Sequence, residues 1–295
     1  MKYRLLTQQV HHEQTGGYFM QTWLITGCSS GLGRCLAFEA LRRGWYNVVV
    51  TARNPNSLTE FSERYPGQAL IQRMDVTKPE EIRQVIRNVG EAFGPIDALV
   101  NNAGYGYRAA VEEGEAEAVE RLFQTNLFGP ITLTKAVLPD MRRRRSGAIV
   151  NIASVAAAVP FPGSGYYAAT KSALESVSDA MRKELAPLNI RVMVVEPGAF
   201  RTDFSGRSLT QSATVIDDYA ETAGKRRIGK ENVHGKQPGD PQKGAALIVD
   251  TITGKMQPPF RLLLGSDAVK VVSQELHQRL DEMEVWSECS QSTDY

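Results

Sequence analysis

Short apolar runs alternate with longer amphipathic stretches along almost the whole chain, from Thr22 onward. A short apolar run bounded by turn residues fits a strand buried on both faces, and a longer amphipathic stretch fits a helix packed on a sheet. Strands that alternate with helices in this way form parallel sheets. We therefore predict an α/β fold with a doubly wound, seven-stranded parallel sheet and helices on both faces. The predicted strands are 22–26, 46–51, 69–73, 96–100, 147–152, 190–195 and 260–264, and the predicted helices are 31–43, 57–65, 79–93, 115–144, 166–185, 240–253 and 266–284.

No linker or internal repeat interrupts this alternation, so we expect a single domain over residues 20–295. Residues 1–19 show no periodicity and are expected to form an irregular N-terminal extension. Residues 201–238 are polar and charged without clear periodicity, which is typical of a long excursion that acts as a lid or substrate loop. The polar tail after Trp286 is expected to be loose.

The composition argues against several classes of function. The chain has 295 residues, of which 42% are hydrophobic and 23% charged, as in an ordinary globular protein with a sizeable core. The net charge of +1 gives no reason to expect nucleic acid or a charged membrane surface as a partner. The sequence contains no run of about 18 apolar residues, which is the length needed to span a bilayer. Residues 1–19 lack the apolar region of a secretory signal. The basic run 142–145 precedes a turn and fits a helix end better than a phosphate site.

The cysteines indicate the redox environment. Cys28, Cys35 and Cys289 are an odd number without the spacing of a disulfide framework or a zinc site. Such usage is expected of a reducing cytoplasm, so we predict a cytoplasmic protein. The histidines are scattered, and the sequence predicts no metal site.

A glycine-rich turn lies between the first predicted strand and the first predicted helix, with glycines at Gly27, Gly31 and Gly33. Glycines there let the backbone approach a pyrophosphate closely at a helix N-terminus, where free N–H groups and the helix dipole favour an anion. A glycine-rich turn alone is weak evidence, because tight turns need glycine anyway. Its place between a strand and a helix favours a dinucleotide site.

The end of the second predicted strand bears on which nucleotide would bind. An NAD site usually carries Asp or Glu there for the adenosine ribose hydroxyls, whereas this strand ends in Thr51-Ala52-Arg53. A guanidinium binds phosphate well, so the sequence favours NADP(H) over NAD(H). The alternative is that Arg53 only starts a solvated turn. Arg34 could also reach the phosphate, but a solvated helix position is the better interpretation.

A tyrosine and a lysine stand four residues apart at the start of a predicted helix, at Tyr167 and Lys171. Residues at this spacing share one helix face, and a nearby ammonium stabilises a phenolate and lowers the pKa of the phenol. Tyr167 would then be a usable acid or base. Ser154 follows the fifth predicted strand and could bond a substrate oxygen beside Tyr167. Taken alone, such a pair is more often a solvated helix face than a site.

Together these motifs resemble the short-chain dehydrogenase/reductase family, over almost the whole chain from Thr22 to about Gly265. The resemblance implies a single-domain Rossmann fold and an NAD(P)-dependent oxidoreductase. It implies a catalytic tetrad of Asn126, Ser154, Tyr167 and Lys171, in which Asn126 holds a water of the proton relay and Lys171 also bonds the nicotinamide ribose. The cofactor contacts that we expect are Gly27, Ser29, Ser30, Gly31, Leu32, Gly33, Arg53, Asp75, Val76, Asn102, Ala103, Gly104, Tyr167, Lys171, Pro197, Gly198 and Thr202.

The same resemblance implies that a secondary alcohol and a ketone are interconverted, with Tyr167 transferring the proton. The segments 197–204 and 259–268 most resemble the 17β-hydroxysteroid dehydrogenase-like subgroup. Residues 155–161, Tyr105 and Tyr107 would surround the nicotinamide end, which favours an apolar or aromatic substrate. Tyr166 should point elsewhere, because it is rotated about 100° from Tyr167 on a helix.

Two other functions use the same motifs. A catalytically silent NADP-binding regulator or scaffold would usually lack the tyrosine or the lysine, and this chain keeps both. An epimerase or dehydratase is disfavoured by the spacing of the glycines. The resemblance also implies a homo-oligomer, a dimer or tetramer, paired through the helices predicted at 115–144 and 166–185.

Overall fold

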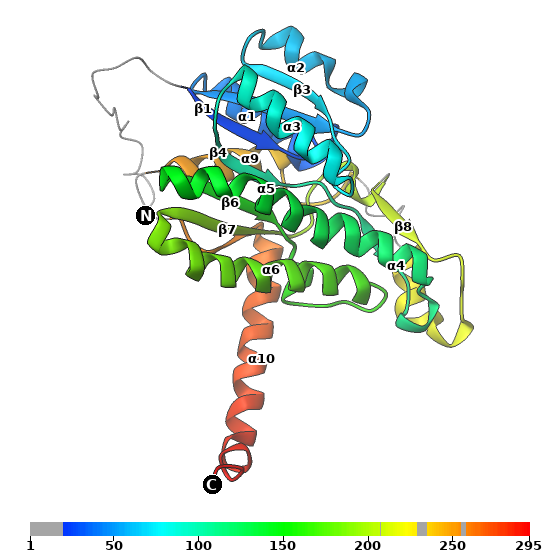
Figure 1. The fold of residues 1–295 in the computed structure, drawn as a ribbon. Helices are drawn as coiled ribbons and strands as arrows, with labels where there is room; N and C mark the ends of the chain where they lie inside the picture. Colours follow the sequence, from blue (N-terminus) through cyan, green and yellow to red (C-terminus); the bar gives the residue numbers. More distant parts are fainter. Residues whose placement is uncertain (1–19, 207, 229–234, 255–257) are drawn as a thin grey trace.

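The computed structural model describes residues 20–206, 208–228, 235–254 and 258–295. Seven strands form one sheet in the order β3-β2-β1-β4-β6-β7-β9, and all neighbouring strands are parallel. The order reverses between β1 and β4, which is the topological switch point at which open α/β sheets bind ligands. Figure 1 shows this sheet at the centre of the molecule. Its strands are β1 (Gln21–Ile25), β2 (Tyr46–Ala52), β3 (Ala69–Arg73), β4 (Ile96–Asn101), β6 (Gly147–Ile152), β7 (Ile190–Pro197) and β9 (Arg261–Leu264).

Helices cover both faces of the sheet, which explains why its strands are apolar on both sides. Helices α1, α2 and α9 pack one buried cluster against one face, and α3, α5 and α6 pack a second cluster against the other. The predicted single Rossmann-type α/β domain with a seven-stranded parallel sheet is confirmed. The helices are α1 (Gly31–Arg42), α2 (Thr59–Arg64), α3 (Pro79–Ala92), α4 (Ala116–Phe123), α5 (Gly129–Arg144), α6 (Gly165–Leu185), α7 (Lys225–Ile228), α9 (Pro241–Thr253) and α10 (Ser266–Gln291).

Two helix predictions need correction. The stretch 115–144 is not one helix, because a π-helical turn at Gln124–Phe128 separates α4 from α5. The tail after Trp286 was expected to be loose, but α10 continues through it to Gln291. Side-chain bonds four residues apart, such as that from the amide of Gln291 to Ser287, support the last turns of α10.

The excursion after β7 carries local structure that the sequence did not predict. Strand β8 (Leu209–Gln211) pairs in parallel with β5 (Gly106–Arg108) to form a separate two-stranded sheet. A 3-10 turn (Asp217–Tyr219), a π-helical turn (Ala220–Gly224) and α7 follow. The predicted N-terminal extension, residues 1–19, and parts of the 201–238 segment lie outside the described residues.

Candidate active site

The predicted proton-transfer residues meet beyond the carboxyl end of β6. Ser154 caps the short 3-10 turn after this strand, where its hydroxyl accepts a hydrogen bond from the N–H of Ala156 at 3.1 Å. The same hydroxyl hydrogen-bonds Tyr167 on the first turn of α6. The structure therefore brings Ser154 and Tyr167 together although they are 13 residues apart in the chain.

Lys171 lies one turn further along the same helix, and its side chain is buried. Its ammonium donates to the carbonyl oxygen of Ile152 at 2.8 Å and lies 5.8 Å from the centroid of the Tyr167 ring. Burial lowers the pKa of this ammonium to about 8. Tyr167 and Lys171 therefore share one helix face, as their spacing predicts.

The acidity of Tyr167 differs from the sequence-based expectation. Burial raises the pKa of the phenol to about 12, although the hydrogen bond with Ser154 acts in the opposite direction. The expectation that Lys171 lowers this pKa is wrong for this structure, because desolvation by burial raises the pKa and the effect that opposes it is the hydrogen bond with Ser154. The phenol therefore stays protonated at neutral pH, which suits a proton donor.

Asn126 joins this group from the π-helical turn, a geometry often found at functional sites. Its side-chain oxygen accepts from the N–H of Tyr105 at 3.1 Å, and its amide donates to the carbonyl of Tyr105 at 2.9 Å and to the Thr170 hydroxyl at 3.2 Å. Thr170 in turn donates to the carbonyl of Tyr167 at 2.7 Å. Asn126 thus ties the loop after β4 to α6. The sequence pointed to Asn126 but missed Thr170, which no motif marks.

The glycine-rich turn forms a cradle at the N-terminus of α1. Gly27 and Gly31 adopt positive φ angles of 72° and 60°, which side chains other than glycine rarely adopt. A Cβ at Gly33 would lie 2.2 Å from the side-chain nitrogen of Asn102. Between these glycines, Ser29, Ser30 and Leu32 present the N–H groups that precede or open the helix. The open backbone here fits a bound pyrophosphate.

The loop after β4 closes this cradle from the next strand along the sheet. The N–H groups of Asn102 and Ala103 both donate to the hydroxyl of Thr26, at 2.9 and 2.8 Å. The amide of Asn102 also donates to the carbonyls of Thr26 and Gly27. Gly104 lies beside Lys171, since a Cβ there would lie 3.5 Å from the lysine nitrogen. Thr26 is a further organising residue that the sequence did not single out.

The residues predicted for the adenosine end lie at the carboxyl ends of β2 and β3. Arg53 is exposed after β2, and no described residue pairs with it as an ion pair. Asp75 follows β3, where its carboxylate accepts from the N–H and hydroxyl of Thr77 at 2.9 and 2.8 Å, and its neighbour Val76 is buried. We expected Arg34 to occupy a solvated helix position. Instead it pairs with Glu60, and its guanidinium stacks over two phenylalanine rings.

The segment after β7 reaches back to the glycine cradle. The N–H of Gly198, which follows Pro197, donates to the carbonyl of Leu264 at 2.9 Å and keeps the segment beside β9. Thr202 lies close to Gly31, because a Cβ at that glycine would be 3.5 Å from the Cβ of Thr202. Of the three predicted contacts in this segment, Thr202 therefore borders the cradle, while Pro197 and Gly198 lie beside β9.

An aromatic side chain of the excursion packs against Tyr167. The ring of Phe204, in the excursion, lies 5.7 Å from the Tyr167 ring. Tyr166 points elsewhere, as predicted, and donates to the carbonyl of Val111 at 2.6 Å. Tyr105 is half-buried, whereas the ring of Tyr107 is buried in the same cluster as Tyr167 and its hydroxyl donates to Glu115. Their place around the nicotinamide end stays a prediction.

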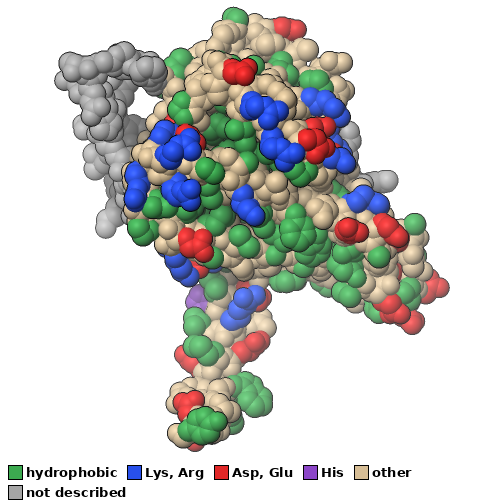
Figure 2. All heavy atoms as spheres, in the orientation of Figure 1, with side chains coloured by type: hydrophobic (Ala, Val, Ile, Leu, Met, Phe, Trp, Pro, Cys, Tyr) green, Lys and Arg blue, Asp and Glu red, His purple; other side chains and the backbone are tan. Residues whose placement is uncertain are grey.

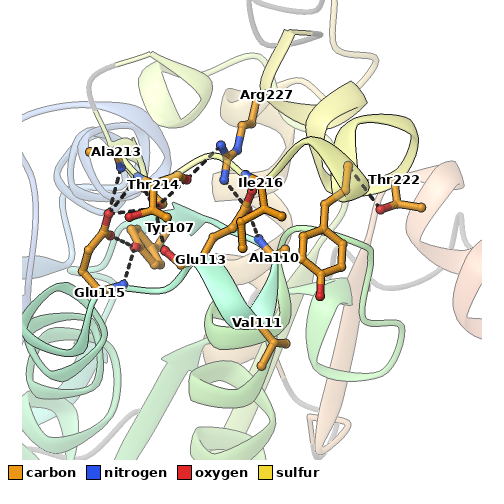
Figure 3. Close-up of polar contacts among 12 residues, drawn as sticks. Tyr107, Ala110, Val111, Glu113, Glu115, Ala213, Thr214, Ile216, Thr222 and Arg227 are labelled. Atoms are coloured by element: carbon orange, nitrogen blue, oxygen red, sulfur yellow. Dashed lines mark hydrogen bonds and ion pairs between the residues drawn. The ribbon is translucent and has the colours of Figure 1, made fainter.

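Two carboxylates between β5 and α4 hold the excursion in place, as Figure 3 shows. Glu113, which is 3% exposed, accepts from the N–H groups of Ala110 and Ile216 and pairs with Arg227. Burial alone would raise the pKa of this carboxyl, but these donors hold it below its ordinary value. No sequence pattern marks this residue, because Ile216 and Arg227 lie more than a hundred positions away.

Glu115 makes the second attachment. One of its oxygens accepts from the N–H of Ala213 at 2.9 Å and from the hydroxyl of Ser212 at 2.7 Å, and the other accepts from Tyr107 (Figure 3). Hydrogen bonds from Tyr107 and Ser212 lower the pKa of this carboxyl to about 2. Both attachments therefore depend on ionised carboxylates.

A glycine cradle at the switch point of a parallel sheet, beside a buried Tyr-Lys pair, defines a dinucleotide-binding oxidoreductase. The family model described as short chain dehydrogenase matches residues 21–213. The chain therefore belongs to the short-chain dehydrogenase family.

Known relatives cover most of the chain. Oxidoreductase BOA17 of Botryotinia fuckeliana is 34% identical over 269 residues, which are 91% of this chain and 97% of that protein. The 3-ketodihydrosphingosine reductase of Bacteroides thetaiotaomicron is 36% identical over 248 residues, 83% of this chain and 88% of that protein. A short-chain dehydrogenase structure from Streptomyces avermitilis superimposes with a TM-score of 0.86 at 40% identity, covering 93% of this chain and all of that one. In the part of the chain that the structure describes, no helix is long and apolar enough to cross a membrane.

Proposed function

We propose that this protein is an NADP-dependent oxidoreductase that interconverts a secondary alcohol and a ketone, with Tyr167 as the acid/base residue. The observation that carries the proposal is the buried arrangement of Ser154, Tyr167 and Lys171 beside the glycine cradle. Scaffolds that only bind nucleotide do not need a buried lysine next to a tyrosine, and burying an ammonium is costly.

In the reductive direction, the substrate carbonyl oxygen lies between the hydroxyls of Ser154 and Tyr167. Ser154 donates a hydrogen bond that orients this oxygen, and Tyr167 gives it a proton as negative charge develops. A phenol with a pKa near 12 is fully protonated at neutral pH and therefore ready to donate. The bound nicotinamide would supply the hydride. Oxidation follows the same path backward.

Lys171 and Asn126 support this proton transfer. The ammonium of Lys171, 5.8 Å from the centroid of the Tyr167 ring, would bond the nicotinamide ribose and so position the cofactor beside the phenol. Asn126 would hold a water that carries the proton onward to Lys171. The hydrogen bonds of Asn126 to Tyr105 and Thr170 fix its side chain between the loop after β4 and α6.

The preference for NADP over NAD rests on Arg53. This guanidinium lies at the end of β2, is exposed, and has no carboxylate partner among the described residues. It can therefore bind the 2′-phosphate, and no acidic side chain ends this strand to repel it. Similar solved structures include complexes with NADP and with NAD, so a direct measurement of both cofactors is needed.

The proposed substrate is apolar or aromatic around its carbonyl. Phe204 flanks Tyr167, and the segment 155–161 after Ser154 is apolar throughout. One relative bears the name 3-ketodihydrosphingosine reductase, so the family members close to this chain include a reductase of a ketone. Residues 201–206 and 208–228 of the excursion form the proposed substrate side. The cysteines support a proposed location in the cytoplasm.

The test is a screen of ketones and secondary alcohols of graded polarity against NADPH, NADH and their oxidised forms. Nicotinamide absorbance reports turnover, and quenching of protein fluorescence reports binding. We expect NADPH-dependent reduction of apolar ketones. Tight NADPH binding without turnover of any carbonyl compound would contradict the proposal and favour a cofactor-binding regulator.

A further inference from the structure

The C-terminal helix α10 leaves the body of the protein as an arm, as Figure 1 shows. Only Ala268 and Val272, in its first two turns, are buried. The last attachment to the body is Arg279, which donates to the carbonyl of Ala158 at 2.8 Å. Beyond Arg279, the side-chain hydrogen bonds made by the described residues of α10 stay within the helix.

This arm carries an apolar stripe that faces solvent. Leu276, Leu280, Met283 and Trp286 follow one another at intervals of three or four residues, so they lie along one side of the helix. They are 53%, 52%, 61% and 65% exposed. An isolated helix gains little stability from propensity alone, and a contiguous apolar face on it marks a binding surface. We call these four residues the arm stripe.

The charges of the arm restrict its partner. From Leu276 to Gln291 the helix carries one arginine and four acidic residues, a net charge of −3. Glu282 and Glu284 flank the arm stripe on its two sides. An anionic lipid surface or a second arm would repel these charges. The partner surface should therefore be apolar in its centre and basic at its rim.

Such a surface exists between α3 and α5. A groove of about 480 Å³ is lined by Ile82, Ile86 and Ala136 together with three basic residues and no acidic one. The basic residues are Arg83, Arg87 and Lys135. No described carboxylate pairs with them, and Arg87 bonds only the amide oxygen of Gln84. Figure 2 shows Lys and Arg side chains gathered over α3 and α5 on the face turned to the viewer.

The arm cannot reach the groove of its own chain. It starts after β9, at one edge of the sheet, and runs straight away from the body (Figure 1). The net charge of −3 on the arm meets three positive charges around the groove. We propose that the arm stripe of one copy docks into the α3/α5 groove of a second copy. This contact uses α3 together with α5, whereas the pairing that the family resemblance implies uses the helices at 115–144 and 166–185. The contact does not depend on the catalytic proposal.

Sedimentation velocity of the full chain over a range of concentrations tests the contact. Leu280→Gln with Met283→Gln should weaken self-association by about tenfold or more, because two large apolar side chains would lose their buried site. Val285→Gln is the matched control, since Val285 is 78% exposed on the opposite side of the helix. An unchanged sedimentation profile of the double variant, or a wild-type protein that stays monomeric, would overturn the proposal.

Charge reversal identifies the groove. Arg83→Glu with Lys135→Glu should reduce association, as should Glu282→Lys with Glu284→Lys, whereas a chain carrying all four substitutions should recover it. Arg142→Glu, at an exposed position outside the groove, should leave association unchanged. If arm substitutions reduce association while groove substitutions do not, or if the fourfold variant does not recover, the arm has another partner and the proposal is wrong.

Discussion

The proposed catalytic framework (Asn126, Ser154, Tyr167 and Lys171) and the excursion that flanks it are held together by different kinds of contact. Around Tyr167, neutral groups such as Asn126, Thr170 and Ser154 bond one another and the backbone. The excursion instead depends on two ionised carboxylates, Glu113 and Glu115. Below the pKa of Lys171, which is about 8, these neutral contacts do not change with pH, whereas carboxylate contacts do. The site thus combines a fixed reaction centre with a substrate side whose attachment can be changed separately.

The largest expected effect comes from removing the proton donor of the framework. Tyr167→Phe keeps the ring, so the fold and the contact with Phe204 should remain. Turnover should fall by at least about 10³-fold, because general acid catalysis and the bond to the developing oxyanion are lost together. Steady-state kinetics with a substrate from the screen, and NADPH titration, measure the two properties separately.

Tyr166→Phe is the matched control, because it removes a neighbouring hydroxyl that only bonds the carbonyl of Val111. We expect its activity to stay within a few-fold of wild type. Wild-type turnover in Tyr167→Phe would refute the assignment of the acid.

The framework could be predicted from the sequence because it follows local patterns. Strand and helix periods placed all seven strands, and the parallel order brought Gly27, Ser154 and Tyr167 to one edge of the sheet. Gly27 and Ser154 each lie two residues after a strand end, so a strand prediction already places them, and Tyr167 follows from the prediction of the next helix.

The excursion could not be predicted in the same way. Glu113 finds its partners Ile216 and Arg227 more than a hundred residues away, and no periodicity marks such a pair. The pairing of β5 with β8 has the same origin, since each strand has only three residues. The high pKa of Tyr167 also escaped prediction, because a sequence shows the neighbouring lysine and not the burial of both groups.

The second prediction concerns the stability that the folded protein loses by burying the ammonium of Lys171. The buried ammonium of Lys171 has a pKa of about 8 in the folded state against an ordinary value of 10.5. This difference corresponds to roughly 3 kcal/mol of unfavourable burial at pH 7. Lys171→Met removes this cost but leaves the carbonyl of Ile152 without its donor, which lowers the free energy of unfolding by about 1 kcal/mol. The variant should therefore be inactive yet more stable than wild type at pH 7, by roughly 2 kcal/mol in urea unfolding.

The pH dependence gives a second check on Lys171. Below the pKa that Lys171 has in the folded protein, its side chain is protonated in both the folded and the unfolded state. The folded protein then bears the full cost of burying the charge. As the pH rises above about 8, only the unfolded state keeps the proton, so wild-type stability should increase. Lys171→Met should lack this increase, while the exposed Lys243→Met should retain it. Parallel profiles for wild type and Lys171→Met between about pH 7 and 9.5 would disprove the burial argument.

The third prediction tests whether Arg53 makes the protein prefer NADPH to NADH. Arg53→Glu should reduce the ratio of kcat/KM for NADPH to that for NADH by about 10- to 100-fold, because a charge-assisted bond becomes a repulsion. Arg53→Gln should have a smaller effect in the same direction. Arg73→Gln, at the end of the neighbouring strand β3, serves as the control. An unchanged ratio in Arg53→Glu would show that this guanidinium does not contact the cofactor.

The smallest expected effect, and the one that separates the two regions most directly, is that of Glu113→Gln. An amide can accept from Ile216 or Ala110, but it leaves Arg227 without its counter-ion. The excursion should loosen while the framework stays intact, so the KM for the carbonyl substrate should rise by about tenfold with little change in cofactor affinity. Limited proteolysis should cut faster within residues 208–228. Glu117→Gln, exposed in the same segment, should change neither property.

Acid should reproduce this effect in the wild-type protein. The pKa of Glu113 is held below its ordinary value, so its contribution is present above that value and is lost as the pH falls through the folded-state pKa. Proteolysis of the excursion in wild type should therefore approach that of Glu113→Gln on acidification, whereas the variant should change much less. A rise in KM accompanied by an equal loss of NADPH affinity would mean that excursion and framework open as one unit.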